Sequence, residues 1–200
     1  MSDSYENLEP VGDPDVPDWE DDYLDRVSDR LMFNYDLEKD FRVAGEVFDL
    51  YGEMVMESEK HFIHPAITFA RHEAREHVFT DRVEAVSVAD LEALVALGHE
   101  LAEDWIEANE RHFSTEFTFV PIVEHLPENV RSFVADFRDR TLLKYGMHGH
   151  YEINLVVVAP AEERLVASEK ADVEEAFRLW DPIEKEEPGL WDLFTRRMQI

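Results

Sequence analysis

Apolar residues recur at helical spacing in four parts of the chain. The clearest run covers residues 88–111, where Ser87 followed three residues later by Asp90 resembles a capping box. The same spacing predicts a helix over residues 19–33 and a last amphipathic segment over residues 170–180. In residues 88–111 the glutamates lie mostly away from one apolar stripe, made of Leu91, Leu94, Val95, Gly98, Leu101, Ala102 and Trp105.

A fourth helix is predicted to begin at Pro127, where the missing N–H of proline costs nothing. Gly146 is well placed to end it. Its apolar face comprises Val130, Phe133, Val134, Phe137, Thr141 and Tyr145.

Alternation of apolar and polar residues predicts strands over residues 41–80. This region is rich in aromatic and β-branched residues and predicts an antiparallel meander, with Pro65 at an edge or bulge. A helical interpretation of residues 41–58 remains open. The meander consists of three runs, at residues 46–57, 61–73 and 76–83.

Further strands are predicted at residues 115–124 and 150–158, with a short one near residues 164–168. Pro121 argues against a central position for the first of these, because proline cannot donate to the ladder. The helix between the first two strands makes a unit long enough for a parallel crossover.

Together these elements predict an α+β fold: a mixed β-sheet, formed by an antiparallel meander plus one β-α-β crossover, with helices packed on at least one face. The expected organisation is an acidic N-terminal arm (1–18), a single α+β domain (19–181) and an amphipathic C-terminal tail (182–200). Because the tail has a strong apolar face, we expect it to pack on its own domain or to make a homo-oligomer. That face contains Leu190, Trp191, Phe194 and Met198.

The charge balance indicates where such a protein functions. There are 47 acidic residues against 19 basic ones, a formal charge of −28, and only five of the basic residues are lysines. Such a surface repels itself at ordinary ionic strength, whereas molar salt removes most of the repulsion. With an ordinary hydrophobic content of 44%, this pattern predicts a salt-adapted, folded, cytoplasmic protein. An acidic protein that binds basic partners is the alternative.

Several function classes are disfavoured by the sequence. Lysine and arginine do not cluster, so no nucleic-acid partner is expected. No apolar run approaches the length of a bilayer span, so no membrane partner is expected either. The chain has no cysteine, no glycine-rich phosphate loop and no GxSxG nucleophile motif.

The best chemical candidate is a possible metal site formed by His148, His150 and Glu152. Alternate residues of a strand point the same way, so two imidazoles and a carboxylate would share one face, as a three-ligand zinc, iron or manganese site requires. The alternative is a solvated strand edge, with Gly149 placing His148 in the preceding turn.

The segment HFIHPAITFARHEAREH holds four more histidines but no local pair with ligand spacing. Its HEAREH hexapeptide separates the histidines by five residues, whereas the zincin motif needs four. His64 remains a candidate fourth ligand that the fold could bring to His148 and His150. Among carboxylates, Glu46 and Glu53 are weak acid–base candidates, and the catalytic residues are unknown.

Two hypotheses follow. The first is a non-enzymatic domain that binds a small ligand or a protein partner, since Phe, Tyr and Trp number 13, 6 and 4 and can line a pocket as well as a core. The second is a metal-dependent hydrolase or related enzyme that uses His148, His150 and Glu152.

Overall fold

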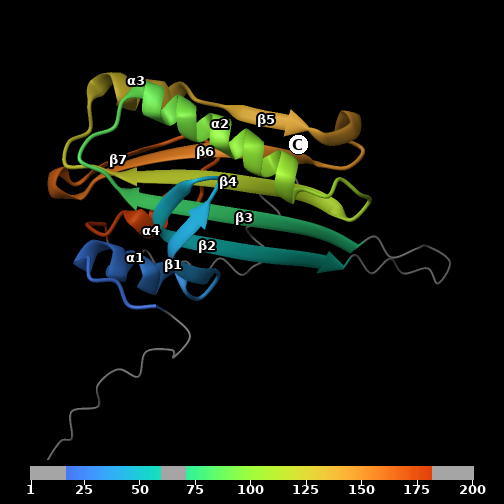
Figure 1. The fold of residues 1–200 in the computed structure, drawn as a ribbon, viewed down its shortest axis with the longest axis horizontal. Helices are drawn as coiled ribbons and strands as arrows, with labels where there is room; N and C mark the ends of the chain where they lie inside the picture. Colours follow the sequence, from blue (N-terminus) through green and yellow to red (C-terminus); the bar gives the residue numbers. More distant parts are fainter. Residues whose placement is uncertain (1–16, 60–70, 182–200) are drawn as a thin grey trace, which may run out of the picture.

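A computed structural model describes residues 17–59 and 71–181. Its centre is a seven-stranded mixed sheet in the order β1-β2-β3-β4-β6-β5, with β7 also paired to β6 (Figure 1). The α+β fold class is therefore confirmed. The strands are β1 (Asp36–Val43), β2 (Glu46–Glu59), β3 (Arg71–Arg82), β4 (His112–Ile122), β5 (Asp139–Leu142), β6 (His150–Ala159) and β7 (Arg164–Ala167).

An antiparallel meander is present and is formed by β1, β2 and β3. Two of the predicted runs correspond to it, since residues 46–57 lie in β2 and residues 76–83 overlap β3. The strand β1 was not among the predicted runs, and most of the run at residues 61–73 lies outside the described residues. The helical interpretation of residues 41–58 is wrong, because neighbouring residues of β2 contribute to opposite faces: Leu50 packs in one core and Tyr51 in the other. Pro65 lies outside the described residues, as do the predicted tail and all but two residues of the predicted N-terminal arm.

Two parallel crossovers complete the sheet. The predicted one joins β4 to β6, and another joins β3 to β4 through α2 (Val88–Trp105). The capping box of α2 is confirmed: the Ser87 hydroxyl accepts a hydrogen bond from the Asp90 N–H, and the Asp90 carboxylate accepts one from the Ser87 N–H at 2.8 Å.

The helix predicted to run from Pro127 to Tyr145 is shorter than expected. Pro127 caps α3 (Glu128–Asp136), and Phe137 is already extended. The chain then forms β5 against β6, followed by the short turn η1 (Leu143–Gly146), so Gly146 ends this turn and not a long helix. The apolar spacing fitted both structures, and pairing with the edge of β6 decided between them.

The expectation that Pro121 keeps its strand off a central position is also wrong. The strand β4 lies between β3 and β6. Its pairing with β6 stops at Phe119 and resumes at Ile122, so the missing N–H of Pro121 falls in an interruption of the ladder.

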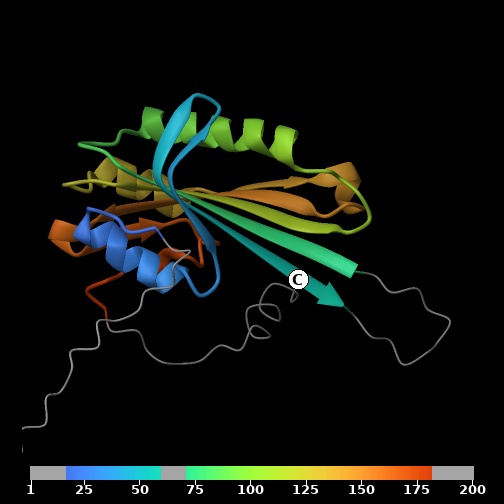
Figure 2. The same cartoon turned by 60° about the horizontal axis from the view of Figure 1, so that its bottom comes forward.

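Helices cover both faces of the sheet (Figures 1 and 2). On one face, called the upper face here, α2 and α3 pack over the aromatic residues of β2, β3 and β4. On the other, the lower face, α1 (Asp22–Leu31) and α4 (Glu174–Phe177) pack over aliphatic residues. The predicted helix at residues 19–33 is thereby confirmed, and α4 is the short helical core of predicted segment 170–180. No helix among the described residues is long and apolar enough to cross a bilayer.

Candidate functional site

The predicted metal ligands do not all lie on one strand. The strand β6 begins at His150, after Gly149, whose φ is +75° and whose added Cβ would lie 2.0 Å from the Phe113 carbonyl oxygen. Only glycine fits there, so the backbone turns and His148 lies before the strand. The question that Gly149 raised in the sequence is answered in favour of a turn.

His150 and Glu152 do come together on the lower face. Nε2 of His150 is 3.3 Å from Oε1 of Glu152, and Nε of Arg140 is 3.4 Å from the same oxygen. Burial raises the pKa of Glu152, but the hydrogen bond from His150 and the positive charges of His150, Arg140 and Lys170 outweigh it, so the pKa is lowered overall. The negative charge of Glu152 is therefore compensated by the groups around it.

A metal site with the predicted ligands has no geometric support from these residues. Within residues 17–59 and 71–181, no group of three or more His, Asp or Glu side chains could hold a metal ion. His64 lies outside the described residues. His148 instead contributes its backbone carbonyl, which accepts a hydrogen bond from Nδ1 of His112 at 2.8 Å.

The carboxylates that the fold buries are not the two that the sequence suggested. Glu76, Glu116 and Glu152 are neighbours on β3, β4 and β6, and each is less than 9% exposed. The Tyr35 hydroxyl donates to Glu76 at 2.7 Å. Glu46 is exposed, and Glu53 is engaged by an arginine. Inward-facing glutamates at matching strand positions become visible only once the strand register is known.

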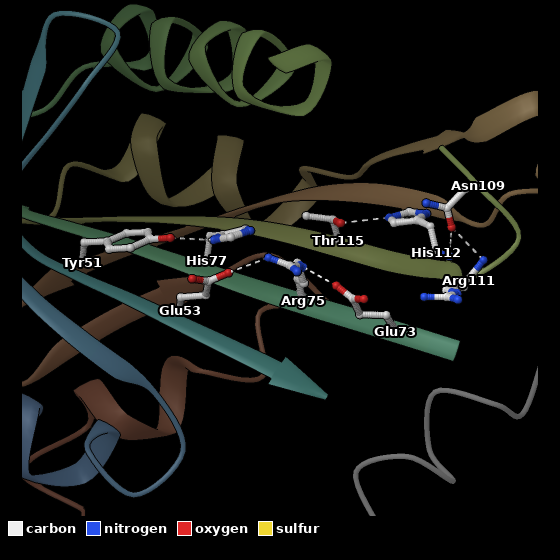
Figure 3. A network of polar contacts seen from close by, with 9 residues as sticks. All are labelled: Tyr51, Glu53, Glu73, Arg75, His77, Asn109, Arg111, His112 and Thr115. Atoms are coloured by element: carbon white, nitrogen blue, oxygen red, sulfur yellow. Dashed lines mark hydrogen bonds and ion pairs between the residues drawn. The ribbon is translucent and has the colours of Figure 1, made fainter. Parts of the chain in front are cut away.

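A second group of polar side chains occupies the upper face, at the end of the sheet where β3, β4 and β6 begin (Figure 3). At its centre is a set that we call the His77 cluster, made of Tyr51, His77, Trp105 and Phe117. The Tyr51 hydroxyl lies 2.8 Å from Nδ1 of His77. The His77 ring stacks on Phe117 at 5.2 Å between centroids and meets Trp105 edge-on at 5.0 Å. These aromatic contacts surround an imidazole that is only 4% exposed.

Burial keeps His77 neutral. Desolvation, assisted by the positive charge of Arg75, lowers the pKa of His77 to about 4. No hydrogen bond joins Nε2 of His77 to any of the residues in the described ranges. At neutral pH this site therefore presents an uncharged ring whose Nε2 makes no hydrogen bond within the described part of the chain.

Arg75 lies beside the cluster and is held by two carboxylates. Its guanidinium donates to Glu73 and, at 3.0 Å, to Glu53. These carboxylates raise the pKa of Arg75 against the opposing effect of its partial burial. Two negative charges around one positive charge leave this part of the site without a net attraction for anions.

His112 and Thr115 form a second hydroxyl–imidazole pair. Nδ1 of His112 must donate to the His148 carbonyl, and burial lowers the pKa of His112, so the ring is neutral and Nε2 accepts from the Thr115 hydroxyl at 2.9 Å. The side chain of Asn109 accepts from the N–H groups of Arg111 and His112, which fixes the turn that enters β4 (Figure 3).

A third pair ends in a carboxylate. Nε2 of His99 lies 3.1 Å from Oδ2 of Asp139, and Nδ1 lies 2.9 Å from the Tyr151 hydroxyl. When Nε2 of the His99 ring donates a hydrogen bond to Asp139, Nδ1 can accept one from the Tyr151 hydroxyl. The three side chains then stand as a hydroxyl, a base and a group that orients the base. Tyr151 and Thr115 are neighbours in the register of β6 and β4, so the second and third pairs adjoin.

Sequence reasoning missed most of this site. His99 interrupts the apolar stripe of the helix between Val95 and Ala102, and a polar residue at such a position was a usable signal. His77 was considered only as a failed zincin histidine. Its pairing with Tyr51 depends on the register of β2 and β3, which places Glu53 opposite His77.

Comparison with known proteins adds a family but no activity. One family model, described as a domain of unknown function, matches residues 20–179 of the 200. No curated protein and no solved structure shows a significant match.

Proposed function

We propose, for a chain that belongs to the DUF8052 family of unknown function, that the domain is a non-enzymatic module that binds a small, uncharged, planar ligand at the His77 cluster. The observation that supports this is the imidazole of His77. It is 4% exposed, its pKa is lowered to about 4, and within the described residues its hydrogen bond is to Tyr51. A neutral ring among aromatic side chains, with Nε2 not hydrogen-bonded to any described residue, suits a ligand that offers one hydrogen bond and a flat face.

The surrounding charges favour an uncharged ligand. Arg75 is already compensated by Glu53 and Glu73, so an anion gains little there. The hydroxyls of Thr115 and Tyr151, which adjoin each other in the strand register, are engaged by His112 and His99. A ligand that carries a full charge would have to be desolvated without a matching partner.

Trp105 is the side chain through which such a ligand would enter. It is the last residue of α2 and is 38% exposed, although its ring contacts those of Tyr51, His77 and Phe117. Rotation of this one side chain at a helix end would uncover the His77 ring without moving the sheet. The ligand would then take over the contacts that the indole makes.

The experiment is an NMR titration of the full chain with three uncharged planar probes: nicotinamide, adenine and indole. We expect at least one probe to shift the indole N–H signal of Trp105 and the ring signals of His77. His77→Phe should abolish the shifts, whereas Trp180→Phe, at a tryptophan on the lower face, should leave them unchanged. Shifts that survive His77→Phe, or no shift with any probe, would contradict the proposal.

A second candidate function rests on Tyr151, His99 and Asp139. Their hydrogen bonds are those that activate a hydroxyl for proton transfer, and the half-exposed ring of His99 leaves this group accessible. Reaction with an aryl sulfonyl fluoride, located by mass spectrometry, reports the nucleophilicity of Tyr151. A tenfold or larger loss of labelling in His99→Gln, relative to the parent chain, would support an acid–base enzyme. Equal labelling of the parent and the variant would count against the enzyme and favour the binding module.

The habitat and assembly also remain proposals. We infer a salt-rich cytoplasm from the charge of −28 and the five lysines. We further infer a homo-oligomer held by residues 182–200, because their sequence offers a continuous apolar face. Light scattering of the intact chain against one truncated after Pro182 tests this: the oligomer should be lost on truncation, and its persistence would refute the inference.

A further inference from the structure

We propose that the loop between β5 and β6, residues 143–149, together with Leu142 at the end of β5, docks this protein on the surface of a lipid bilayer. In this arrangement Tyr145 and Met147 insert among the lipids and Lys144 meets the lipid phosphates. The loop closes the β5–β6 hairpin at the right-hand end of the sheet in Figure 1. It shares no residue with the His77 cluster, so the test of one proposal does not decide the other.

The first observation is the charge of this segment. Residues 140–151 contain no Asp or Glu, although 47 of the 200 residues of the chain are acidic. They contain Arg140 and Lys144 together with two histidines. Only residues 60–72 form a longer acid-free run, and most of that run lies outside the described residues. Carboxylates here would be repelled by lipid phosphates, so their absence fits a surface that meets a bilayer.

The second observation is the exposure of large apolar side chains in the same loop. Tyr145 is 99% exposed, Met147 74% and Leu142 58%. Three such residues within six positions form a protruding apolar tip, whereas isolated exposed apolar residues are ordinary. An aromatic ring beside a lysine is the combination that side chains at a membrane interface use, with the ring among the lipids and the amine in the head groups.

The third observation is that the backbone holds this tip in an unfavourable shape. Lys144, Tyr145 and Gly146 have φ values of 48°, 59° and 84°, all in the left-handed region. Glycine and asparagine adopt this conformation readily, but lysine and tyrosine do so at a cost of about 1 kcal/mol or more each. The loop is closed by N–H donation from Leu143 to the Gly149 carbonyl at 2.9 Å and from Met147 to the Lys144 carbonyl at 3.2 Å. A fully exposed tyrosine at such a position contributes nothing to packing, so we assign it to contact with a partner.

Other partners fit the loop less well. A second copy of this loop would bring like charges together across a twofold axis. Nucleic acid requires more cations than one lysine and one arginine provide. A bilayer requires only a convex apolar tip with flanking cations, which this loop has. Such docking differs from the sequence-based expectation of no membrane partner, and it needs no membrane-spanning segment.

The experiment measures co-sedimentation of the full chain with vesicles of phosphatidylcholine containing phosphatidylglycerol, at molar KCl. The main variant is Tyr145→Asn with Met147→Ser. Asparagine tolerates the left-handed conformation, so this variant should fold at least as well as the parent. The matched control is Phe33→Ser, because Phe33 is 79% exposed but lies just beyond α1.

We expect the parent chain and the Phe33→Ser variant to bind the vesicles equally. The double variant should bind about tenfold more weakly or worse, because the inserted apolar area is lost. Circular dichroism of both variants checks that the fold is intact. The proposal is overturned if the parent does not sediment with vesicles, if the folded double variant binds as well as the parent, or if the chain binds polyglutamate or single-stranded DNA but no vesicles.

Discussion

Acidification should destabilise this protein through His77. The pKa of this histidine is lowered from an ordinary value of 6.5 to about 4, chiefly by burial. Between these two pH values the unfolded chain binds a proton at His77 that the folded chain excludes. The neutral ring therefore gives its full contribution to the free energy of unfolding above pH 6.5, and that contribution is lost as the pH falls toward 4.

The size of the effect follows from the shift. A difference of one pKa unit corresponds to about 1.4 kcal/mol, so the whole window is worth about 3 kcal/mol. Between about pH 7 and about pH 5 the expected loss is about 2 kcal/mol, a large share of the marginal stability of a domain. Because His77 is only 4% exposed, solvent does not screen this contribution.

The assay is urea unfolding of the parent chain and of His77→Gln at both pH values, in molar KCl. Glutamine cannot titrate in this range but can still hydrogen-bond the Tyr51 hydroxyl. Carboxylates and the other histidines titrate in both proteins, so the difference between their pH responses isolates His77. The parent should lose about 2 kcal/mol more than the variant. Parallel losses, or an NMR titration of His77 near its ordinary pKa, would refute the reasoning.

Three further predictions concern other parts of the molecule. Burial and the adjacent Asp49 carboxylate raise the pKa of Asp81 to about 6, so the stability that the protonated Asp81 contributes is lost as the pH rises through 6. After allowance for the partial exposure of Asp81, urea unfolding should show that Asp81→Asn stabilises the protein by about 1 kcal/mol at neutral pH and not at pH 4. An equal gain in stability at the two pH values would contradict this prediction. Gly149→Ala should lower the free energy of unfolding by more than about 2 kcal/mol, because the added Cβ would lie 2.0 Å from the Phe113 carbonyl oxygen. Gly45 has a φ of +89° and open space around it, so Gly45→Ala should lower it by only about 1 kcal/mol. Similar melting temperatures for the two variants would contradict this prediction. Thermal melts should show stability that rises steeply toward molar KCl, while full stability near 0.1 M, where the Debye length is still about 10 Å, would count against salt adaptation.

The sequence by itself determined most of the secondary structure and the fold class. The capped helix α2 and the strand β6 were predicted because each has one strong periodicity, whereas a helical interpretation had remained open for the region of β2. The sequence-based prediction was wrong where the same apolar spacing fitted both a helix and a strand. Phe137 and Thr141 matched a helical face, yet the edge of β6 was available, and residues 139–142 became a strand.

The candidate site was decided by tertiary structure. Two of the three histidine pairs join residues far apart in the sequence: Tyr51 and His77 are 26 positions apart, and His99 and Tyr151 are 52 apart. The register of β2 and β3 brings the first pair together, and the packing of α2 on the sheet brings the second together. The three predicted ligands His148, His150 and Glu152 do not share one strand for a local reason, since Gly149 turns the backbone before β6. Composition determined the charge of the chain, and periodicity predicted most but not all of the strands. Which polar side chains meet depends on strand register and on helix packing, and no local sequence pattern encodes these.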